Sequence, residues 1–151
     1  MKTVLTVAGS DPSGGAGIQA DIKTITAHGL YATSAITALT VQNTLGVSRV
    51  EPVPVDLVAQ QIDCVVGDIR PDAVKIGMLC NAEIVQAVAQ ALAHGQAECI
   101  VIDPVMISTS GHRLLDQEAV QWMKRKLFPM AQLITPNLPE AEALCGMRVR
   151  D

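Results

Sequence analysis

The sequence predicts one α/β domain over residues 1–151, a three-layer αβα sandwich around a mostly parallel sheet. Short apolar runs alternate with helical segments of ten or more residues, which is the pattern of βαβ units with right-handed crossovers. Hydrophobic residues make up 49% of the chain but aromatic residues only 2%. The core must therefore be built from Ala, Val, Ile and Leu, as in a parallel sheet covered by helices on both faces.

Apolar periodicity gives the order of the elements. Strands are expected at residues 3–8, 31–41, 47–53, 73–76, 99–102 and 132–134. Helices are expected at residues 16–28, 56–69, 82–94 and 139–144, with one more that begins at Asp116 and ends before Pro129. Asn81 is a candidate N-cap for helix 82–94, and Gly95 follows its end.

Composition argues against several classes of partner and site. A net charge of −4 leaves no basic patch for nucleic acid or an anionic membrane surface. No apolar window approaches 18 residues and no signal-peptide pattern is present, so we expect a soluble, cytoplasmic protein. Cys64, Cys80, Cys99 and Cys145 lack metal-ligand spacing. Cys64 and Cys99 lie in apolar segments and are expected to be small core residues.

A glycine-rich loop between the first strand and the first helix is the most informative segment. Gly14, Gly15 and Gly17 follow the Asp11-Pro12 turn. Such a loop can form a pocket whose backbone N–H groups face a ligand. A tight turn with no ligand is the alternative.

Two known phosphate-binding motifs fit this loop poorly. Gly15-x-Gly17-x-x-Ala20 satisfies the dinucleotide fingerprint, but the region 35–39, where the ribose-binding carboxylate is expected, has none. A P-loop requires Gly-Lys-Ser/Thr, and Ile18 follows Gly17, so a P-loop is excluded.

Polar residues follow almost every predicted strand. In such sheets, ligands bind beyond the carboxyl ends of the strands. We therefore expect these segments at one rim, where Lys75, inside its strand, is the one candidate basic residue. The segments are the loop with Asp11, then 42–44, 77–78, 103–105, 108–111 and 135–140.

Five blocks of sequence together resemble the hydroxymethylpyrimidine/phosphomethylpyrimidine kinases of thiamine biosynthesis, in the ribokinase-like superfamily. The blocks are GSDPSGGAGIQAD (9–21), TVQNT (40–44), VKIGML (74–79), DPVM (103–106) and TPNLPEAE (135–142). The resemblance implies a ribokinase-like fold. It also implies ATP-dependent phosphorylation of the pyrimidine alcohol 4-amino-5-hydroxymethyl-2-methylpyrimidine and then of its monophosphate.

The resemblance also implies roles for individual residues. Gln42 would read the ring edge, because a carboxamide both donates and accepts hydrogen bonds. The alternative for Gln42 is that it is a solvated loop residue without a ligand, and the alternative for Met78 is that it only packs in the core. Beside Gln42, the resemblance implies that Gly9, Asp21 and Val41 line the pyrimidine pocket, partly through backbone groups, and that Met78 and Val105 supply apolar walls.

A second group would serve ATP and Mg²⁺. The resemblance places Asp103, Asn137 and Glu140 near the ATP phosphates, with Asp103 and Glu140 near Mg²⁺. Asp103 could instead form a turn before Pro104, and Asn137-x-x-Glu140 also fits a capping box. Both roles are compatible for the last pair, because a helix N-terminus favours phosphate.

The family's chains continue beyond the equivalent of Asp151 and carry there a Gly-Thr-Gly-Cys loop with the anion hole and the catalytic residue. The chain therefore matches the N-terminal part of a ribokinase-like kinase domain, and no catalytic residue is assigned within it. We expect a polypeptide ending at Asp151 to show no phosphotransfer, and the complete form to be a homodimer. A pyridoxal kinase-like enzyme and a non-catalytic pyrimidine-binding fragment are the alternatives.

Overall fold

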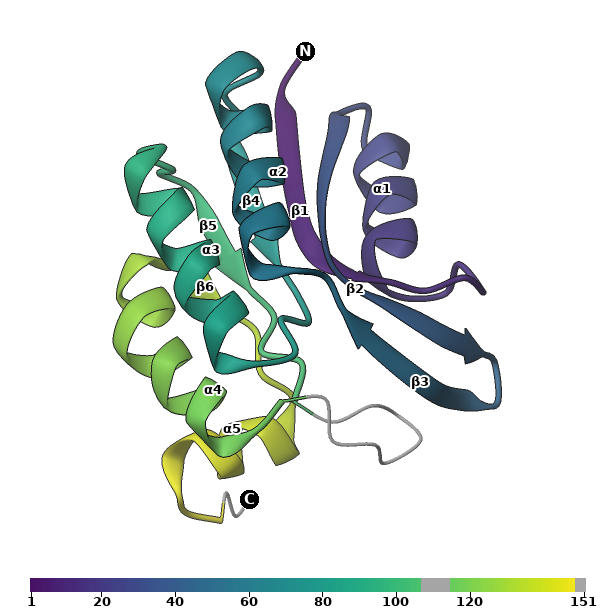
Figure 1. The fold of residues 1–151 in the computed structure, drawn as a ribbon, viewed down its shortest axis with the longest axis vertical. Helices are drawn as coiled ribbons and strands as arrows, with labels where there is room; N and C mark the ends of the chain where they lie inside the picture. Colours follow the sequence, from purple (N-terminus) through teal and green to yellow (C-terminus); the bar gives the residue numbers. More distant parts are fainter. Residues whose placement is uncertain (107–114, 149–151) are drawn as a thin grey trace.

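A six-stranded, mostly parallel sheet forms the centre of the computed structural model, which describes residues 1–106 and 115–148 (Figure 1). The strand order is β3-β2-β1-β4-β5-β6. All neighbouring strands pair in parallel except β2 and β3, which form an antiparallel pair. The strands are β1 (Thr3–Ser10), β2 (Tyr31–Asn43), β3 (Gly46–Pro52), β4 (Ala73–Ile76), β5 (Ile100–Ile102) and β6 (Leu133–Ile134).

Helices cover both faces of the sheet, as the sequence predicts. Helices α2, α3 and α4 lie side by side on one face, and α1 packs on the other against β1 and β2 (Figure 1). The helices are α1 (Gly17–Ala27), α2 (Val55–Asp68), α3 (Ala82–His94), α4 (Gln117–Trp122) and α5 (Leu138–Cys145). Helix α4 continues through a π-helical turn, Met123–Leu127, and a 3₁₀ turn, Phe128–Met130, so the helical segment runs past Pro129 rather than ending before it.

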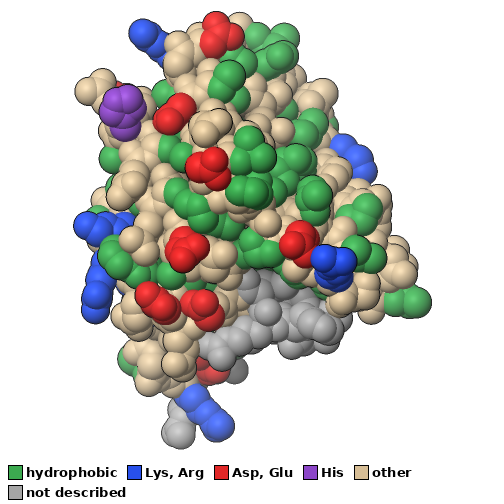
Figure 2. Space-filling view, in the orientation of Figure 1, with side chains coloured by type: hydrophobic (Ala, Val, Ile, Leu, Met, Phe, Trp, Pro, Cys, Tyr) green, Lys and Arg blue, Asp and Glu red, His purple; other side chains and the backbone are tan. Residues whose placement is uncertain are grey.

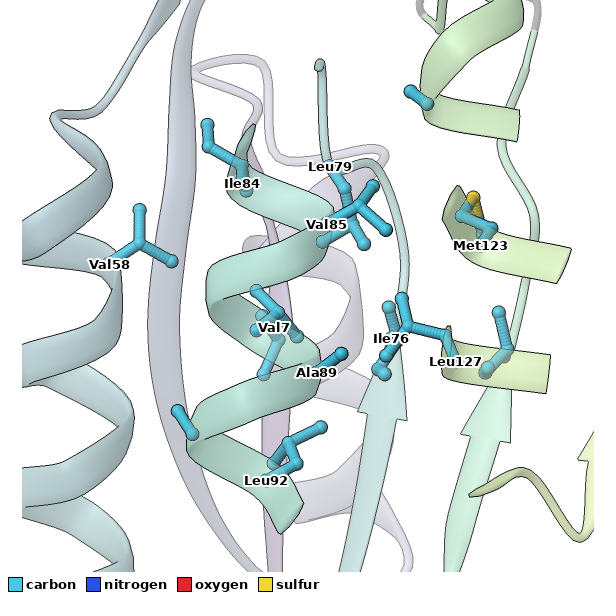
Figure 3. Packing of buried hydrophobic residues seen from close by; sticks show 14 of the residues in the cluster. Val7, Val58, Ile76, Leu79, Ile84, Val85, Ala89, Leu92, Met123 and Leu127 are labelled. Carbon is cyan, nitrogen blue, oxygen red and sulfur yellow. The ribbon is translucent and has the colours of Figure 1, made fainter. Parts of the chain in front are cut away.

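Side-chain alternation on the central strands separates the two layers. Leu5, Val7 and Ile76 are fully buried and belong to the main core, which also includes residues of α2, α3 and α4. Figure 3 shows Val7 and Ile76 among the packed side chains of this core. Thr6 and Lys75, one residue away, are register partners and both bond to Asp21 on α1. Because successive side chains of a strand point to opposite faces, one strand surface builds the core and the other builds polar contacts with α1.

The elements agree with the predicted ones to within a few residues, with two consequences for the site. Strand β1 runs to Ser10 instead of residue 8, and β2 runs to Asn43 instead of 41. Gly9 and Gln42 are therefore strand residues. Asn81 is the N-cap of α3 as predicted, since its side chain accepts a hydrogen bond from the Ile84 N–H at 2.9 Å.

The prediction for the cysteines is wrong for Cys64, which is exposed on α2, and Cys99 is only half-buried. The buried positions of α2 are Val58 and Ile62, and Cys64 falls off that apolar stripe. On the molecular face shown in Figure 2, Lys and Arg side chains lie mostly at the margins. No helix in the described part of the chain combines the length and apolarity needed to cross a bilayer.

Candidate active site

A cavity of about 560 Å³ lies at the carboxyl ends of the central strands. The connection after β1 leads to β2 on one side, and the connection after β4 leads to β5 on the other. Ligands of open α/β sheets bind where the strand order reverses in this way. Eight of the nine predicted site residues line the cavity: Gly9, Asp21, Gln42, Met78, Asp103, Val105, Asn137 and Glu140.

The glycine loop is organised around the side chain of Asp11, which is only 2% exposed. Asp11 Oδ1 accepts hydrogen bonds from Ser13 N at 2.8 Å and Ser13 Oγ at 2.7 Å. Its Oδ2 accepts from Gly15 N at 3.0 Å and Ala16 N at 2.8 Å. The expectation that these backbone N–H groups face a ligand is therefore wrong for Ser13, Gly15 and Ala16. The loop binds its own carboxylate.

These hydrogen bonds control the ionisation of Asp11. Burial acts to raise the pKa of its carboxyl, but the hydrogen bonds from Ser13, Ala16 and Gly15 outweigh burial and hold the pKa below its ordinary value. An Asp side chain that bonds backbone N–H groups a few residues ahead is an Asx turn, which the Asp-Pro-Ser-Gly sequence could have indicated.

Gly17 allows the loop to close against the end of β1. Its φ is +56°, and a Cβ at this position would lie 2.2 Å from the Gly9 carbonyl oxygen. No other residue type fits both the conformation and the space. This close approach places the first turn of α1, and with it Asp21, at the cavity wall.

Asp21 lies at the centre of a polar cluster on the α1 face of the sheet. Thr6 Oγ1 donates to Asp21 Oδ2 at 2.6 Å. Lys75 Nζ lies 2.9 Å from both oxygens of Asp21. The side chains of Lys75 and Asp21 are 28% and 17% exposed, so the ion pair is largely removed from solvent. The sequence predicts that Lys75 lies at the rim but does not indicate its partner.

Gln42 reaches the cavity because side chains alternate along the end of β2. Thr40 and Gln42 both line the cavity, whereas Leu39 and Val41 are exposed. Val41 is thus the one predicted pocket residue that does not line the cavity, and its side chain is 58% exposed. Thr40 Oγ1 donates to Ser10 O at 2.8 Å and also lies 3.2 Å from Gln42 Oε1. The pairing of β2 with β3 shifts register between Val41 and Gln42.

Met78 and Val105 are among the apolar residues that line the cavity. A Cβ on Gly9 would lie 2.5 Å from Met78 Cε, so the glycine leaves room for the methionine side chain. Met78 is buried and its carbonyl oxygen accepts a hydrogen bond from Thr37 Oγ1 at 2.6 Å. Core packing and a pocket-facing role therefore coexist in this residue.

Asp103, Asn137 and Glu140 line another part of the same cavity. The capping box is confirmed, since Asn137 Oδ1 accepts from Glu140 N at 2.9 Å and Glu140 Oε2 accepts from Asn137 N at 3.0 Å. Glu140 is only 5% exposed, and its Oε1 accepts from Met106 N at 3.3 Å. One buried carboxylate thus joins the start of α5 to the segment after β5.

The electrostatics around Asp103 are unfavourable for its negative charge. Burial raises the pKa of the Asp103 carboxyl above its ordinary value, the Lys75 ammonium opposes this, and the negative charges of Glu140 and Asp21 raise it further. A cation bound at this position would stabilise the ionised form. Within residues 1–106 and 115–148, no group of three or more His, Cys, Asp or Glu side chains is arranged to hold a metal ion by itself. The predicted site segment 108–111 lies outside the described residues.

Comparisons with known proteins identify the relatives of this chain. Residues 11–151 match the family model described as phosphomethylpyrimidine kinase. The hydroxymethylpyrimidine/phosphomethylpyrimidine kinase of Haemophilus influenzae is 51% identical over the whole chain, and that of Escherichia coli is 54% identical over 95% of it. The chain covers 56% and 55% of these two proteins, so it spans about half their length.

Solved structures agree with the sequence comparison. The crystal structure of phosphomethylpyrimidine kinase from Clostridium difficile has a TM-score of 0.93 and 48% identity, and the match covers the whole chain and 65% of that protein. The Staphylococcus aureus pyridoxal kinase in complex with AMP-PCP and pyridoxal has a TM-score of 0.86 and 36% identity, covering the whole chain and 54% of that protein. The family match, the identities and the fold lead to one conclusion: the chain belongs to the phosphomethylpyrimidine kinase family.

Proposed function

We propose that this chain forms the substrate-binding half of an ATP-dependent kinase that phosphorylates 4-amino-5-hydroxymethyl-2-methylpyrimidine and then its monophosphate. The observation that supports this most directly is the composition of the cavity. Hydrogen-bonding groups suited to a pyrimidine, Asp21 and Gln42, share one cavity with apolar Met78 and with the carboxylates Asp103 and Glu140. Relatives of about 50% identity are named hydroxymethylpyrimidine/phosphomethylpyrimidine kinases.

The cavity residues form two groups, one suited to bind the pyrimidine and one suited to interact with the charged phosphates. The Gln42 carboxamide can donate to and accept from an aminopyrimidine edge, Asp21 accepts from a substrate donor, and Met78 contacts the ring face. Transfer of a γ-phosphoryl group depends mainly on positioning and charge neutralisation. Holding the pyrimidine at one wall would present its alcohol to the rest of the cavity.

The residues present fit a magnesium–nucleotide complex. Mg²⁺ binds proteins through one or two carboxylates together with substrate phosphates. Asp103 and Glu140 supply such a pair. Because burial and the neighbouring carboxylates raise the pKa of Asp103, a nearby cation would stabilise its ionised form. Asn137 is the N-cap of α5, a helix end that favours phosphate. When bound, Mg²⁺ would neutralise charge on the phosphates.

We also propose that the complete form is a homodimer. The exposed apolar side chains of Leu39, Val41 and Leu45 at the end of β2 and its turn supply a surface for association. Light scattering on the complete form would show a mass of two chains if this is correct. A mass of one chain would contradict it.

A coupled ADP-release assay tests the kinase activity. The completed chain for this assay joins residues 1–151 to the C-terminal part of the Haemophilus influenzae relative, of which this chain spans 56%. We expect ATP-dependent turnover of the hydroxymethylpyrimidine by the completed chain, and none by residues 1–151 alone. Pyridoxal is the competing substrate, because pyridoxal kinases share the fold. A kcat/KM for pyridoxal equal to or above that for the pyrimidine would contradict the assignment.

A further inference from the structure

Lys75 occupies an unusual place for a charged residue. It is the third residue of the short strand β4, which lies between β1 and β5 inside the sheet. Its strand neighbours Val74 and Ile76 are buried in the core. Among the described residues that line the cavity, Lys75 is the only Lys or Arg, and the same lining holds the carboxylates Asp11, Asp21, Asp103 and Glu140.

The surroundings of Lys75 direct its ammonium group to Asp21. Both Asp21 oxygens lie 2.9 Å from Nζ, and Thr6 Oγ1 approaches Oδ2 from the sheet at 2.6 Å. A Cβ on Gly77 would lie 3.1 Å from Nζ, so the glycine leaves the space that the ammonium fills. Asp21 Oδ1 receives only the Lys75 contact among these, and a carboxylate oxygen can accept two hydrogen bonds. The Asp21 carboxylate therefore retains acceptor capacity at the cavity wall.

Stability alone gives little reason to keep this pair. An ion pair taken largely out of water loses hydration that its attraction barely repays, and apolar replacements of such pairs are often neutral or stabilising. The pair also lies at the edge of a cavity rather than in the packed core. A role toward a ligand explains its position better than a role in folding.

We propose that Lys75 is a positioning residue for substrate recognition. Its ammonium fixes the Asp21 carboxylate as a hydrogen-bond acceptor at the cavity wall, so that the site selects a ligand that presents an N–H or O–H donor there. The inference rests on the proposed function for the identity of that ligand, the hydroxymethylpyrimidine. Its amino and hydroxyl groups are the two donors that Asp21 can accept.

Calorimetric binding to residues 1–151 and to the completed chain tests the role in selectivity. The ligands are the parent pyrimidine, an analogue without the amino group and an analogue with a methylated hydroxyl. We expect the wild type to bind one analogue about ten- to a hundredfold more weakly than the parent, and Lys75→Met to lose most of that discrimination. Lys75→Arg should retain it. Lys2→Met, which removes the exposed ion pair with Asp72 at the opposite end of β1, should leave it unchanged.

Crystal structures of ligand-free wild type and Lys75→Met separate this inference from the proposed function. We expect the Asp21 carboxylate to leave its position at the cavity wall in Lys75→Met. An unmoved Asp21, or a Lys75→Met variant that keeps the wild-type discrimination between ligands, would overturn the inference. Failure of the wild type to bind any of the pyrimidines would instead overturn the proposed function, and the position of Asp21 in the two structures would still decide the role of Lys75.

Discussion

Replacing Asp11 with asparagine should loosen the glycine loop by an amount that follows from its hydrogen bonds. Asparagine keeps one acceptor oxygen and places an NH₂ group where the other oxygen was. Either the Ser13 N–H or the Gly15 and Ala16 N–H groups would then face a donor, whereas the Ser13 hydroxyl, which contacts both Asp11 oxygens, can accept from the new NH₂ group. One or two hydrogen bonds to a charged acceptor are lost, each contributing about 1.5 kcal/mol at the lower end of their range, and the remaining ones are weakened because their acceptor becomes neutral. Water can reach Gly15 and Ala16, which are exposed, so we expect Asp11→Asn to cost about 2–3 kcal/mol of unfolding free energy.

Urea denaturation of the purified chain measures this cost, with Asp63→Asn on the exposed surface of α2 as the matched control. The pKa of Asp11 is depressed in the folded state, so its stabilisation is present above pH 3.8, its ordinary value, and is lost as the pH falls through the folded-state pKa. The difference between wild type and Asp11→Asn should shrink in that acidic range. A loss under about 0.5 kcal/mol at neutral pH, within the range of ordinary surface substitutions, would refute the reasoning.

Three further predictions concern the cavity and the loop. Gln42→Leu in the completed chain should weaken pyrimidine binding by about 1–3 kcal/mol in calorimetry and leave ATP affinity unchanged; an unchanged pyrimidine Kd would remove Gln42 from the site. Asp103→Asn and Glu140→Gln should lower kcat far more than pyrimidine affinity and alter the Mg²⁺ dependence in the ADP-release assay, whereas a loss of thermal stability with normal turnover would leave both residues purely structural roles. Gly17→Ala should destabilise the fold by at least about 3 kcal/mol in urea, because it combines strain at φ +56° with a backbone clash, while Gly67→Ala on α2, with open space around it, should be neutral or stabilising.

The layered fold could be predicted from sequence because periodicity and composition both depend on the core. Strands such as 73–76 and helices such as 82–94 are recognisable from apolar spacing that the structure confirms. The ends of strands near the cavity were less predictable. The sequence predicts that Gly9 and Gln42 follow their strands, because polar and glycine residues usually end a strand, yet both lie within strands whose pairing continues past the apolar run.

The site residues could be grouped from sequence, but not their partners. Eight of them share one cavity because the carboxyl ends of parallel strands meet at one edge. Val41 lies outside the cavity because successive side chains of a strand point to opposite faces, and Gln42 takes the face toward the cavity. This alternation applies to Gln42 only because β2 extends past residue 41. The contacts of Asp11 with its own loop and of Lys75 with Asp21 depend on side-chain positions that spacing alone does not fix.

Strand β2 extends beyond its pairing with β1, and this extension determines where Gln42 lies. Its pairing with β1 ends at Leu39, and from Thr40 to Asn43 it pairs only with β3. The β2–β3 hairpin therefore projects beyond the other strands of the sheet (Figure 1). Thr40 Oγ1 donates a hydrogen bond to Ser10 O at the point where this projection begins. The position of Gln42 in the cavity therefore depends on the pairing of β2 with β3 and on the contact of Thr40 with Ser10, because the end of β2 has left β1.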